Sequence, residues 1–261
     1  MVKRLRLLQH AEGRSQQGLL LLEGTHLLQE ALRLQLQPVE LLATPLWWSR
    51  QAALVAALPP GCACQLVSEE VLGAIATTRH PDGVVLTLSP PAEASCGLEP
   101  DVQPCLVLAL DGLQDPGNLG TLMRTALASG VGTLWLADGA DPFQPKVLRA
   151  SAGAALALPL RRESRAALAQ RLGAARAAGL QLVVAVRPGA GPAPPLPYWQ
   201  VDWRRPTVLL LGNEGAGVSA ELEALASQRV TIPHSRAVES LNVAVAAAPL
   251  LLERLRQQAG A

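Results

Sequence analysis

The sequence predicts an α/β protein in which a small N-terminal α/β domain precedes a C-terminal domain with a parallel sheet. Three observations support this prediction. Short apolar runs alternate with helical segments or loops along the chain, as in strands joined by helices. The runs in the second half are apolar throughout, which is typical of parallel strands covered on both faces. Between the halves, residues 91–104 are rich in proline and have no periodicity, so we expect a linker there.

Residues 1–90 form the first predicted domain. The run at 18–24 is apolar between two glycines, which indicates a buried strand, and Thr25 is a suitable N-cap for a helix to about residue 34. A turn near residue 81 carries Arg79 and His80, which could touch a nucleic-acid backbone or simply be solvated. We further expect strands at 39–43, 64–67 and 83–88, and helices at 49–58 and 68–76, the second capped by Ser68.

Residues 105–261 form the second predicted domain. Its final helix is expected over 241–256, with Pro249 in its interior, where proline costs about 3 kcal/mol unless the helix is kinked. Ligands of parallel α/β sheets bind at the carboxyl ends of the strands, so we expect a ligand site in the loops that follow the strands. We expect strands at 105–110, 133–137, 156–160, 180–186, 207–211 and 229–232.

Composition excludes several classes of protein. The chain has 261 residues, of which 49% are hydrophobic, and this is ample for a packed core. No apolar run is long enough to span a bilayer, and residues 1–6 do not resemble a secretion signal, so we expect a cytoplasmic protein without a membrane partner. The four cysteines have no zinc-site spacing, and we expect free thiols and no metal.

The first polar junction follows the predicted strand that ends at Leu110. Asp115-Pro116-Gly117 indicates a turn, and Asn118 is placed to cap the helix behind it. Arg124 follows six residues later, in the second helical turn, from which it could point back towards the loop. Taken alone, this stretch is a strand, a turn and a helix with a surface arginine.

The second polar junction is Gly212-Asn213-Glu214-Gly215-Ala216-Gly217, directly after a predicted strand. Its glycines would let a ligand approach the backbone closely. The stretch lacks the Lys-Ser/Thr pair of a P-loop and the third glycine of a dinucleotide fingerprint, so a Rossmann-type nucleotide enzyme is a weak alternative. Glu214 is unusual here, because Asp or Asn would suit a purely structural turn better.

The third polar junction opens the final helix. Ser240 is placed to cap it, and the first N–H groups of a helix have no partners inside the helix, so they can hold a polar or anionic ligand. Asn242 lies in an otherwise apolar segment and needs a hydrogen-bond partner. Taken alone, this stretch is better explained as an ordinary capped core helix in which the Asn has found a partner.

Together, the three junctions resemble a known enzyme family. Residues 118–124, 211–217 and 232–243 are similar to the three motifs of the SpoU (TrmH-like) family of RNA ribose 2′-O-methyltransferases, in the SPOUT superfamily. Residues 14–31 and 77–83 are similar to the family's N-terminal substrate-binding domain. The resemblance implies a deep trefoil knot that holds S-adenosylmethionine, and a homodimer that shares RNA across its interface.

The resemblance also implies roles for individual residues. Arg124 matches the arginine assigned to activation of the ribose hydroxyl. Because a guanidinium stays protonated at ordinary pH, we expect it to hold a phosphate and to stabilise charge on the 2′ oxygen. The other catalytic residues implied by position are Asn118, Glu214, Ser240 and Asn242. The implied cofactor-binding residues are Leu211, Gly212, Asn213, Gly217, Ile232, Leu241, Asn242 and Ala246, and no metal is implied.

The chain departs from the family at His234 and Arg236, where members usually have Met and Gly, so the loop that enters the knot is expected to differ in shape or in RNA contact. The predicted function is transfer of a methyl group from S-adenosylmethionine to a ribose 2′-hydroxyl of RNA, with ribosomal RNA favoured over transfer RNA by the N-terminal domain. The alternative is a non-catalytic RNA-binding or ribosome-assembly module with the same fold. Such a module would not need Asn118, Arg124 and Glu214 together, which favours the enzyme.

Overall fold

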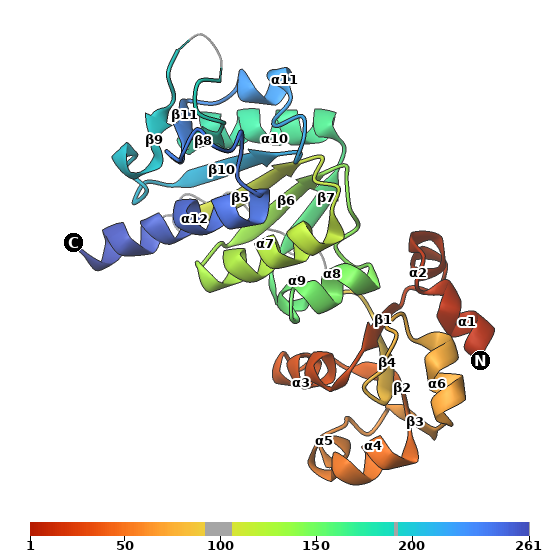
Figure 1. The fold of residues 1–261 in the computed structure, drawn as a ribbon. Coiled ribbons are helices and arrows are strands. Elements are labelled where there is room, and N and C mark those ends of the chain that lie inside the picture. Colours follow the sequence, from red (N-terminus) through yellow and green to blue (C-terminus); the bar gives the residue numbers. More distant parts are fainter. Residues whose placement is uncertain (92–105, 191–192, 261) are drawn as a thin grey trace. The chain divides into compact units, whose positions relative to one another are not determined.

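The computed structural model describes residues 1–91, 106–190 and 193–260 (Figure 1). The predicted linker at 91–104 lies outside these residues, except for Pro91. Within the described part of the chain, no helix is both long and apolar enough to cross a membrane.

The chain divides into two compact units. The first comprises residues 1–92 and 141–157, and the second comprises residues 93–140 and 158–261. The segment 141–157 therefore packs with the first unit, although in the sequence it lies between two strands of the second.

The first unit is built on a four-stranded sheet with the order β1-β4-β2-β3. Strands β1 and β2 run antiparallel to β4, whereas the edge strand β3 runs parallel to β2. Its elements are α1 (Val2–Leu7), α2 (Ala11–Gln17), β1 (Leu20–Glu23), α3 (Thr25–Arg33), β2 (Pro38–Ala43), α4 (Pro45–Arg50), α5 (Ala52–Ala56), β3 (Ala63–Leu66), α6 (Glu69–Ile75), β4 (Val84–Leu88), α8 (Pro145–Ala150) and α9 (Ala154–Ala157).

A buried carboxylate, Glu23, ends β1 and holds the loop that follows α6. Its oxygens accept hydrogen bonds from the backbone N–H groups of Thr77 (2.9 Å) and Thr78 (3.2 Å) and from the hydroxyls of both threonines. Arg149 of α8 pairs with the same carboxylate at 3.3 Å, and α8 packs against β1. Side chains from three separate segments thus meet at one buried charge.

The second unit contains a seven-stranded sheet with the order β7-β6-β5-β10-β8-β11-β9, in which every neighbouring pair is parallel. This confirms the predicted parallel α/β sheet. Its elements are β5 (Leu106–Asp111), α7 (Pro116–Ala128), β6 (Thr133–Ala137), β7 (Leu160–Glu163), α10 (Arg165–Ala177), β8 (Gln181–Ala185), β9 (Leu196–Pro197), the 3₁₀ helix η1 (Tyr198–Gln200), β10 (Thr207–Gly212), α11 (Ala220–Glu223), β11 (Gln228–Thr231) and α12 (Val243–Ala259).

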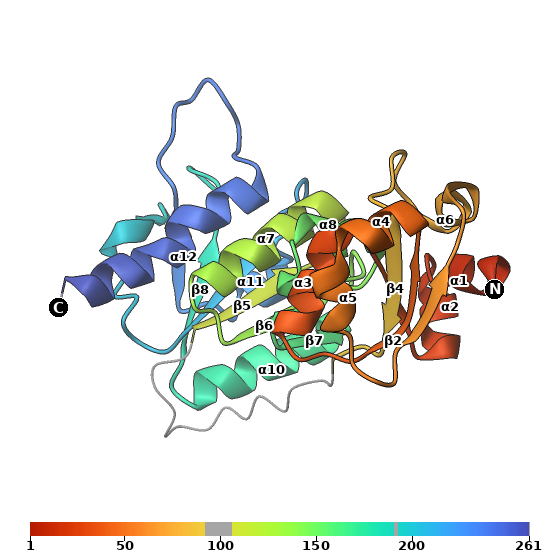
Figure 2. The same cartoon turned by 90° about the horizontal axis from the view of Figure 1, so that it is seen from below.

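Helices cover both faces of this sheet, as Figures 1 and 2 show. On one face, α10 packs through Leu168, Leu172 and Ala175, whose spacing places them on one side of the helix. On the other face, α7 and α12 lie side by side and pack against each other. Because both faces are covered, the strands can be apolar at every position, which explains their lack of alternation.

Two predicted elements are wrong. The helix predicted at 49–58 begins earlier, because Thr44 accepts a hydrogen bond from Trp47 N (3.2 Å) and Pro45 follows it; non-helical angles at Gln51 then divide it into α4 and α5. The strand predicted at 156–160 is preceded by a helical turn and starts only at Leu160. It continues through two arginines, which an edge strand tolerates because one side of it is open.

Candidate functional site

The three polar junctions meet in the second unit. Glu214, which follows β10, accepts a hydrogen bond from Asn118 Nδ2 at 3.2 Å. Asn118 Oδ1 accepts one from Asn242 Nδ2 at 2.9 Å. One chain of hydrogen bonds therefore joins side chains that lie about a hundred residues apart in the sequence.

Asp115, rather than the predicted Asn118, caps α7. Its Oδ1 accepts a hydrogen bond from Asn118 N at 2.8 Å, and Pro116 occupies the first helical position, where its missing N–H costs nothing. Asn118 consequently lies inside the first turn, and its side chain is available for Glu214 and Asn242. Arg124 lies further along α7 and is exposed to solvent.

The loop after β10 is closed by its own backbone. Asn213 and Gly217 exchange two hydrogen bonds of 2.9 and 3.0 Å, and Asn213 Oδ1 accepts two more from Gly215 N and Ala216 N. A Cβ atom at Gly212 would lie 2.0 Å from the carbonyl carbon of Gly217. The glycine at 212 is thus required by close approach within the chain itself, a reason that the sequence analysis did not foresee.

The end of β5, Asp111 and the following Gly112, holds this loop at both of its ends. The carboxylate is 1% exposed, and its Oδ2 accepts a hydrogen bond from Ser219 N at 2.8 Å. Arg165 Nε donates to Oδ1 at 2.7 Å, which gives the buried charge a partner. At the other end of the loop, Asn213 Nδ2 donates to the carbonyl of Gly112 at 2.9 Å. The end of β5 therefore positions the whole of residues 213–219.

Asn242, not the predicted Ser240, caps α12. Asn242 Oδ1 accepts hydrogen bonds from Ala244 N (2.9 Å) and Val245 N (3.3 Å), whereas Ser240 lies two residues outside the cap and is exposed. Because the cap already satisfies these two N–H groups, they cannot also hold a ligand as predicted. Asn242 has instead a double role, since its Nδ2 is the group that reaches Asn118.

Glu214 receives three donors. Besides Asn118 Nδ2, its carboxylate accepts hydrogen bonds from Asp115 N at 3.0 Å and Gln114 N at 3.2 Å. Desolvation raises the pKa of this carboxyl, but the hydrogen bonds to its charged form outweigh that effect, and the pKa lies below the ordinary value of 4.5. Glu214 is therefore ionised at neutral pH.

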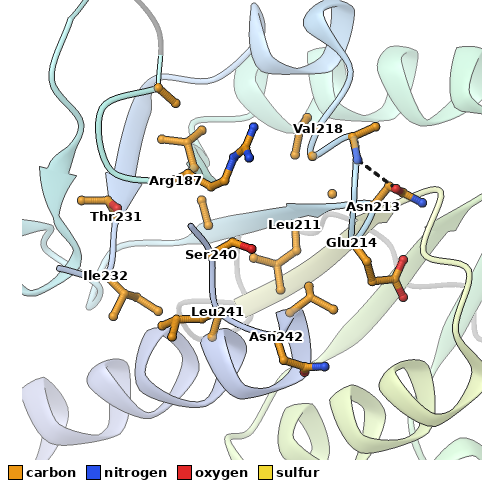
Figure 3. A pocket seen from close by; sticks show the side chains of 18 of the residues that line it. Arg187, Leu211, Asn213, Glu214, Val218, Thr231, Ile232, Ser240, Leu241 and Asn242 are labelled. Atoms are coloured by element: carbon orange, nitrogen blue, oxygen red, sulfur yellow. Dashed lines mark hydrogen bonds between the residues drawn. The ribbon is translucent and has the colours of Figure 1, made fainter. Parts of the chain in front are cut away.

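A pocket of about 430 Å³ opens beside this hydrogen-bonded chain (Figure 3). In the figure, Leu211 and Ser240 lie between Arg187 on one side and Asn242 on the other. Arg124 is the one predicted site residue that does not line the pocket. The predicted site residues that do are Asn118, Leu211, Gly212, Asn213, Glu214, Gly217, Ile232, Ser240, Leu241, Asn242 and Ala246.

Comparison with known proteins places this site in a family. A sequence model of the SpoU rRNA methylase family matches residues 105–252, which include all three junctions and the pocket. The chain belongs to the SpoU rRNA methylase family. A second model, of the MRM3-like substrate binding domain, matches residues 1–86.

Two methyltransferase relatives match this chain over almost its whole length. A Synechocystis protein named as an uncharacterised tRNA/rRNA methyltransferase is 43% identical, covering 99% of this chain and 91% of the relative. A 23S rRNA guanosine 2′-O-methyltransferase of Bacillus subtilis is 33% identical, covering 91% of this chain and 89% of the relative.

This chain is also similar to solved structures of two methyltransferases. An AdoMet-bound rRNA methyltransferase from Sinorhizobium meliloti has a TM-score of 0.80 at 32% identity, covering 98% of this chain and 94% of that one. The SpoU methyltransferase AviRb from Streptomyces viridochromogenes, in complex with AdoMet, has a TM-score of 0.85 at 26% identity, covering 99% and 97% of the two chains.

Sequence reasoning missed several residues of the SpoU pocket. Thr231, at the end of β11, lines it with a buried hydroxyl that has no hydrogen-bond partner among the described residues. Arg187 and Glu223 come from a loop and a short helix whose patterns carry no distinguishing signal. Asp111, which does not line the pocket but holds the end of its wall at Ser219, did have a usable signal, because a charged residue at the end of an apolar run requires a partner. Within the described residues, no cluster of side chains suited to a metal ion is found.

Proposed function

We propose that this protein transfers a methyl group from S-adenosylmethionine to a ribose 2′-hydroxyl of ribosomal RNA. The observation that carries the proposal is the hydrogen-bonded chain Glu214–Asn118–Asn242 at the wall of a pocket, in a chain of the SpoU family. Relatives named as 23S rRNA 2′-O-methyltransferases support the reaction and the choice of RNA. Solved relatives with bound AdoMet support the cofactor.

The pocket residues fit this cofactor. Leu211, Ile232, Leu241 and Ala246 provide an apolar wall suited to an adenine ring, and the buried hydroxyl of Thr231 has hydrogen-bonding capacity to offer. When bound, S-adenosylmethionine supplies a methyl group on a positively charged sulfur, which reacts with an oxygen nucleophile. The protein's part is to bind both reactants in line and to exclude water.

Glu214 and the two asparagines act in this proposal by positioning. The carboxylate of Glu214 is ionised and already accepts three hydrogen bonds, so it is poorly suited to take the proton of a ribose hydroxyl. It holds residues 114–118 against the loop after β10 instead. Asn242 then ties the start of α12 to Asn118, so that the three segments share one geometry.

Arg124 is proposed to act on the RNA. Its exposed position on α7 suits an incoming phosphate, and its permanent charge can stabilise an oxyanion as the 2′ oxygen loses its proton. Ser240 lies at the pocket without capping α12, which leaves its hydroxyl available to a ligand.

The N-terminal domain, residues 1–90, is proposed to bind RNA, with a linker at 91–104 and a methyltransferase domain at 105–261. The matched ranges 1–86 and 105–252 support these boundaries. Arg79 and His80 are exposed on the loop that Glu23 holds, where they can contact a phosphate backbone. Ribosomal RNA as the substrate also favours a cytoplasmic location.

A homodimer and a trefoil knot are also part of the proposal. On α12, Val245, Leu252 and Leu255 are 62%, 45% and 40% exposed, and their spacing of seven and three residues forms an apolar stripe. A stripe of this kind on a surface helix suits a second copy of the chain. Leu252→Arg should then convert a dimer to a monomer in sedimentation velocity, whereas Leu46→Arg, at an equally exposed residue of the first unit, should leave it unchanged.

The reaction is tested with labelled S-adenosylmethionine and 23S rRNA from cells that lack the gene. The wild-type protein should transfer label to RNA as a 2′-O-methyl group, and Arg124→Ala should reduce the rate by about 100-fold or more, as for loss of one group that stabilises an oxyanion. Arg176→Ala, at an exposed arginine of α10, is the control and should retain full activity. Cofactor binding without any methyl transfer would contradict catalysis and favour the RNA-binding module.

A further inference from the structure

Arg187 and Glu239 form an ion pair beside the pocket. Arg187 lines the pocket just after β8, and its Nη1 donates a hydrogen bond to the carboxylate of Glu239, on the loop that precedes α12. The two side chains are 53% and 81% exposed. A pair as exposed as this contributes little to folding stability, so it can open at small cost.

The carboxylates that line the pocket, Glu214 and Glu223, already have strong partners. Glu223 accepts from Arg229 Nε at 2.8 Å, and Glu214 has its three donors. Among the described residues of the lining, Arg187 and His234 are the only basic side chains, and His234 Nδ1 lies 2.7 Å from the carbonyl of Ile232. An anionic group that enters the pocket therefore has Arg187 as its natural partner.

We propose that Arg187 binds the carboxylate of the cofactor's methionyl group, and that Glu239 occupies the guanidinium until this carboxylate replaces it. The inference rests on the proposed function. S-adenosylmethionine carries one carboxylate, whereas its sulfonium and ammonium groups are cations that a guanidinium repels. Guanidinium and carboxylate match in shape and can form two parallel hydrogen bonds. Exchange of one carboxylate for another leaves the charge balance at Arg187 unchanged.

The two partners then have opposite effects on binding. Loss of Arg187 removes a charge-assisted hydrogen bond to the cofactor, which corresponds to about 10-fold weaker binding or more. Loss of the charge on Glu239 removes a competitor, so binding becomes tighter. If the pair were only a structural clasp between two loops, both substitutions would weaken binding.

Calorimetry on the full chain tests this inference with two ligands that differ in one group, S-adenosylmethionine and its decarboxylated analogue. Arg187→Ala should weaken binding of S-adenosylmethionine about 10-fold and should not weaken binding of the analogue, and Glu239→Gln should strengthen binding of S-adenosylmethionine but not of the analogue. Arg204→Ala is the matched control, because Arg204 is similarly exposed and pairs with Asp202. It should alter neither ligand.

Three results would overturn the inference. Equal weakening of both ligands by Arg187→Ala would show that the carboxylate is not what Arg187 binds. Weaker binding of S-adenosylmethionine by Glu239→Gln would show a structural clasp. A wild-type protein that binds neither ligand would overturn the proposed function as well, whereas the first two results leave that function standing.

Discussion

Each unit of the protein has a buried carboxylate at the end of a strand, and the two carboxylates hold loops in different ways. Glu23 receives four hydrogen bonds from Thr77 and Thr78 and pairs with Arg149, so nearly all of its capacity serves one short stretch of chain. Asp111 accepts hydrogen bonds from Ser219 N and Arg165 Nε, which belong to two separate segments.

The two loops have different tasks, and the way each is held reflects its task. The loop held by Glu23 is fixed at its base, which leaves exposed residues further along it to meet a partner. The loop after β10 is fixed at Ser219 by Asp111 and at Asn213 by the carbonyl of Gly112, and it forms the wall of a pocket. Substitution of Glu23 should therefore lower mainly the free energy of unfolding, and substitution of Asp111 should lower mainly the affinity for the cofactor.

The largest effect is expected for Glu23→Ala. The substitution leaves Arg149 and two threonine hydroxyls without their buried acceptor, and we expect a loss of about 3 kcal/mol in the free energy of unfolding, measured by chemical denaturation. Glu40 pairs with Arg4 and is more exposed than Glu23, so Glu40→Ala should cost less than about 1 kcal/mol. Similar losses for the two variants would contradict the assigned role of Glu23.

The next effect is expected for Asp111→Ala. Release of Ser219 N should loosen residues 213–219 and weaken S-adenosylmethionine binding by about 10-fold, the equivalent of one lost hydrogen bond to a charged group. Glu163→Ala is the control, because Glu163 pairs with Arg171 and does not line the pocket. It should lower stability while the folded protein binds the cofactor normally. Unchanged affinity in Asp111→Ala would show that the loop does not depend on this carboxylate.

A neutral side chain should have a smaller effect than either acid. Asn242→Ala removes the cap of α12 and should cost about 1 kcal/mol in thermal or chemical unfolding. Ser240→Ala, two residues earlier, should stay within about 0.5 kcal/mol because Ser240 is exposed and caps nothing. If Ser240→Ala were the more costly of the two, the cap would lie where the sequence analysis first placed it.

The smallest effect at neutral pH is expected for Glu214→Gln, since glutamine keeps one acceptor oxygen for the same donors. The pKa of Glu214 is lowered in the folded protein, so the contribution of its charge is complete above the ordinary value of 4.5 and is lost as pH falls through the lowered pKa. The part of the free energy of unfolding that Glu214 contributes should thus be constant from about pH 5 to 8 and fall in more acid solution, as measured by chemical denaturation. Glu214→Gln should reduce that acid-side fall; an unaltered pH profile would contradict it.

Much of the fold could be predicted because parallel strands buried on both faces leave a plain apolar signal. The strands at 133–137 and 207–211 are confirmed almost to the residue. Edge positions could not be predicted in this way. Strand β7 contains two arginines and has little apolar character, since an edge strand is covered on one side only.

The sequence indicated three separate polar junctions, but it could not show that their side chains contact one another. Glu214 and Asn242 were unusual polar residues in their stretches, Asn118 was a candidate helix cap, and the site roles of all three came from the resemblance to the family. Their hydrogen bonds to one another give a physical reason for the polar residues.

Ser68 is confirmed as a helix cap, whereas Gly24 and not Thr25 stands at the cap of α3. The caps predicted for α7 and α12 were both wrong. A shift of two or three positions leaves the local pattern unchanged, so only the fold could decide between Asp115 and Asn118.

The segment 141–157 has a consequence for how the protein is made. Glu23 finds its partner Arg149, and β1 its covering helix α8, in chain that is synthesised only after strands β5 and β6 of the second unit. Domains usually fold in the order in which they leave the ribosome. Here the N-terminal unit cannot be complete until residue 157 has been made, so a nascent chain that stops at residue 90 should be protease-sensitive, and resistance should appear only in nascent chains that extend past 157.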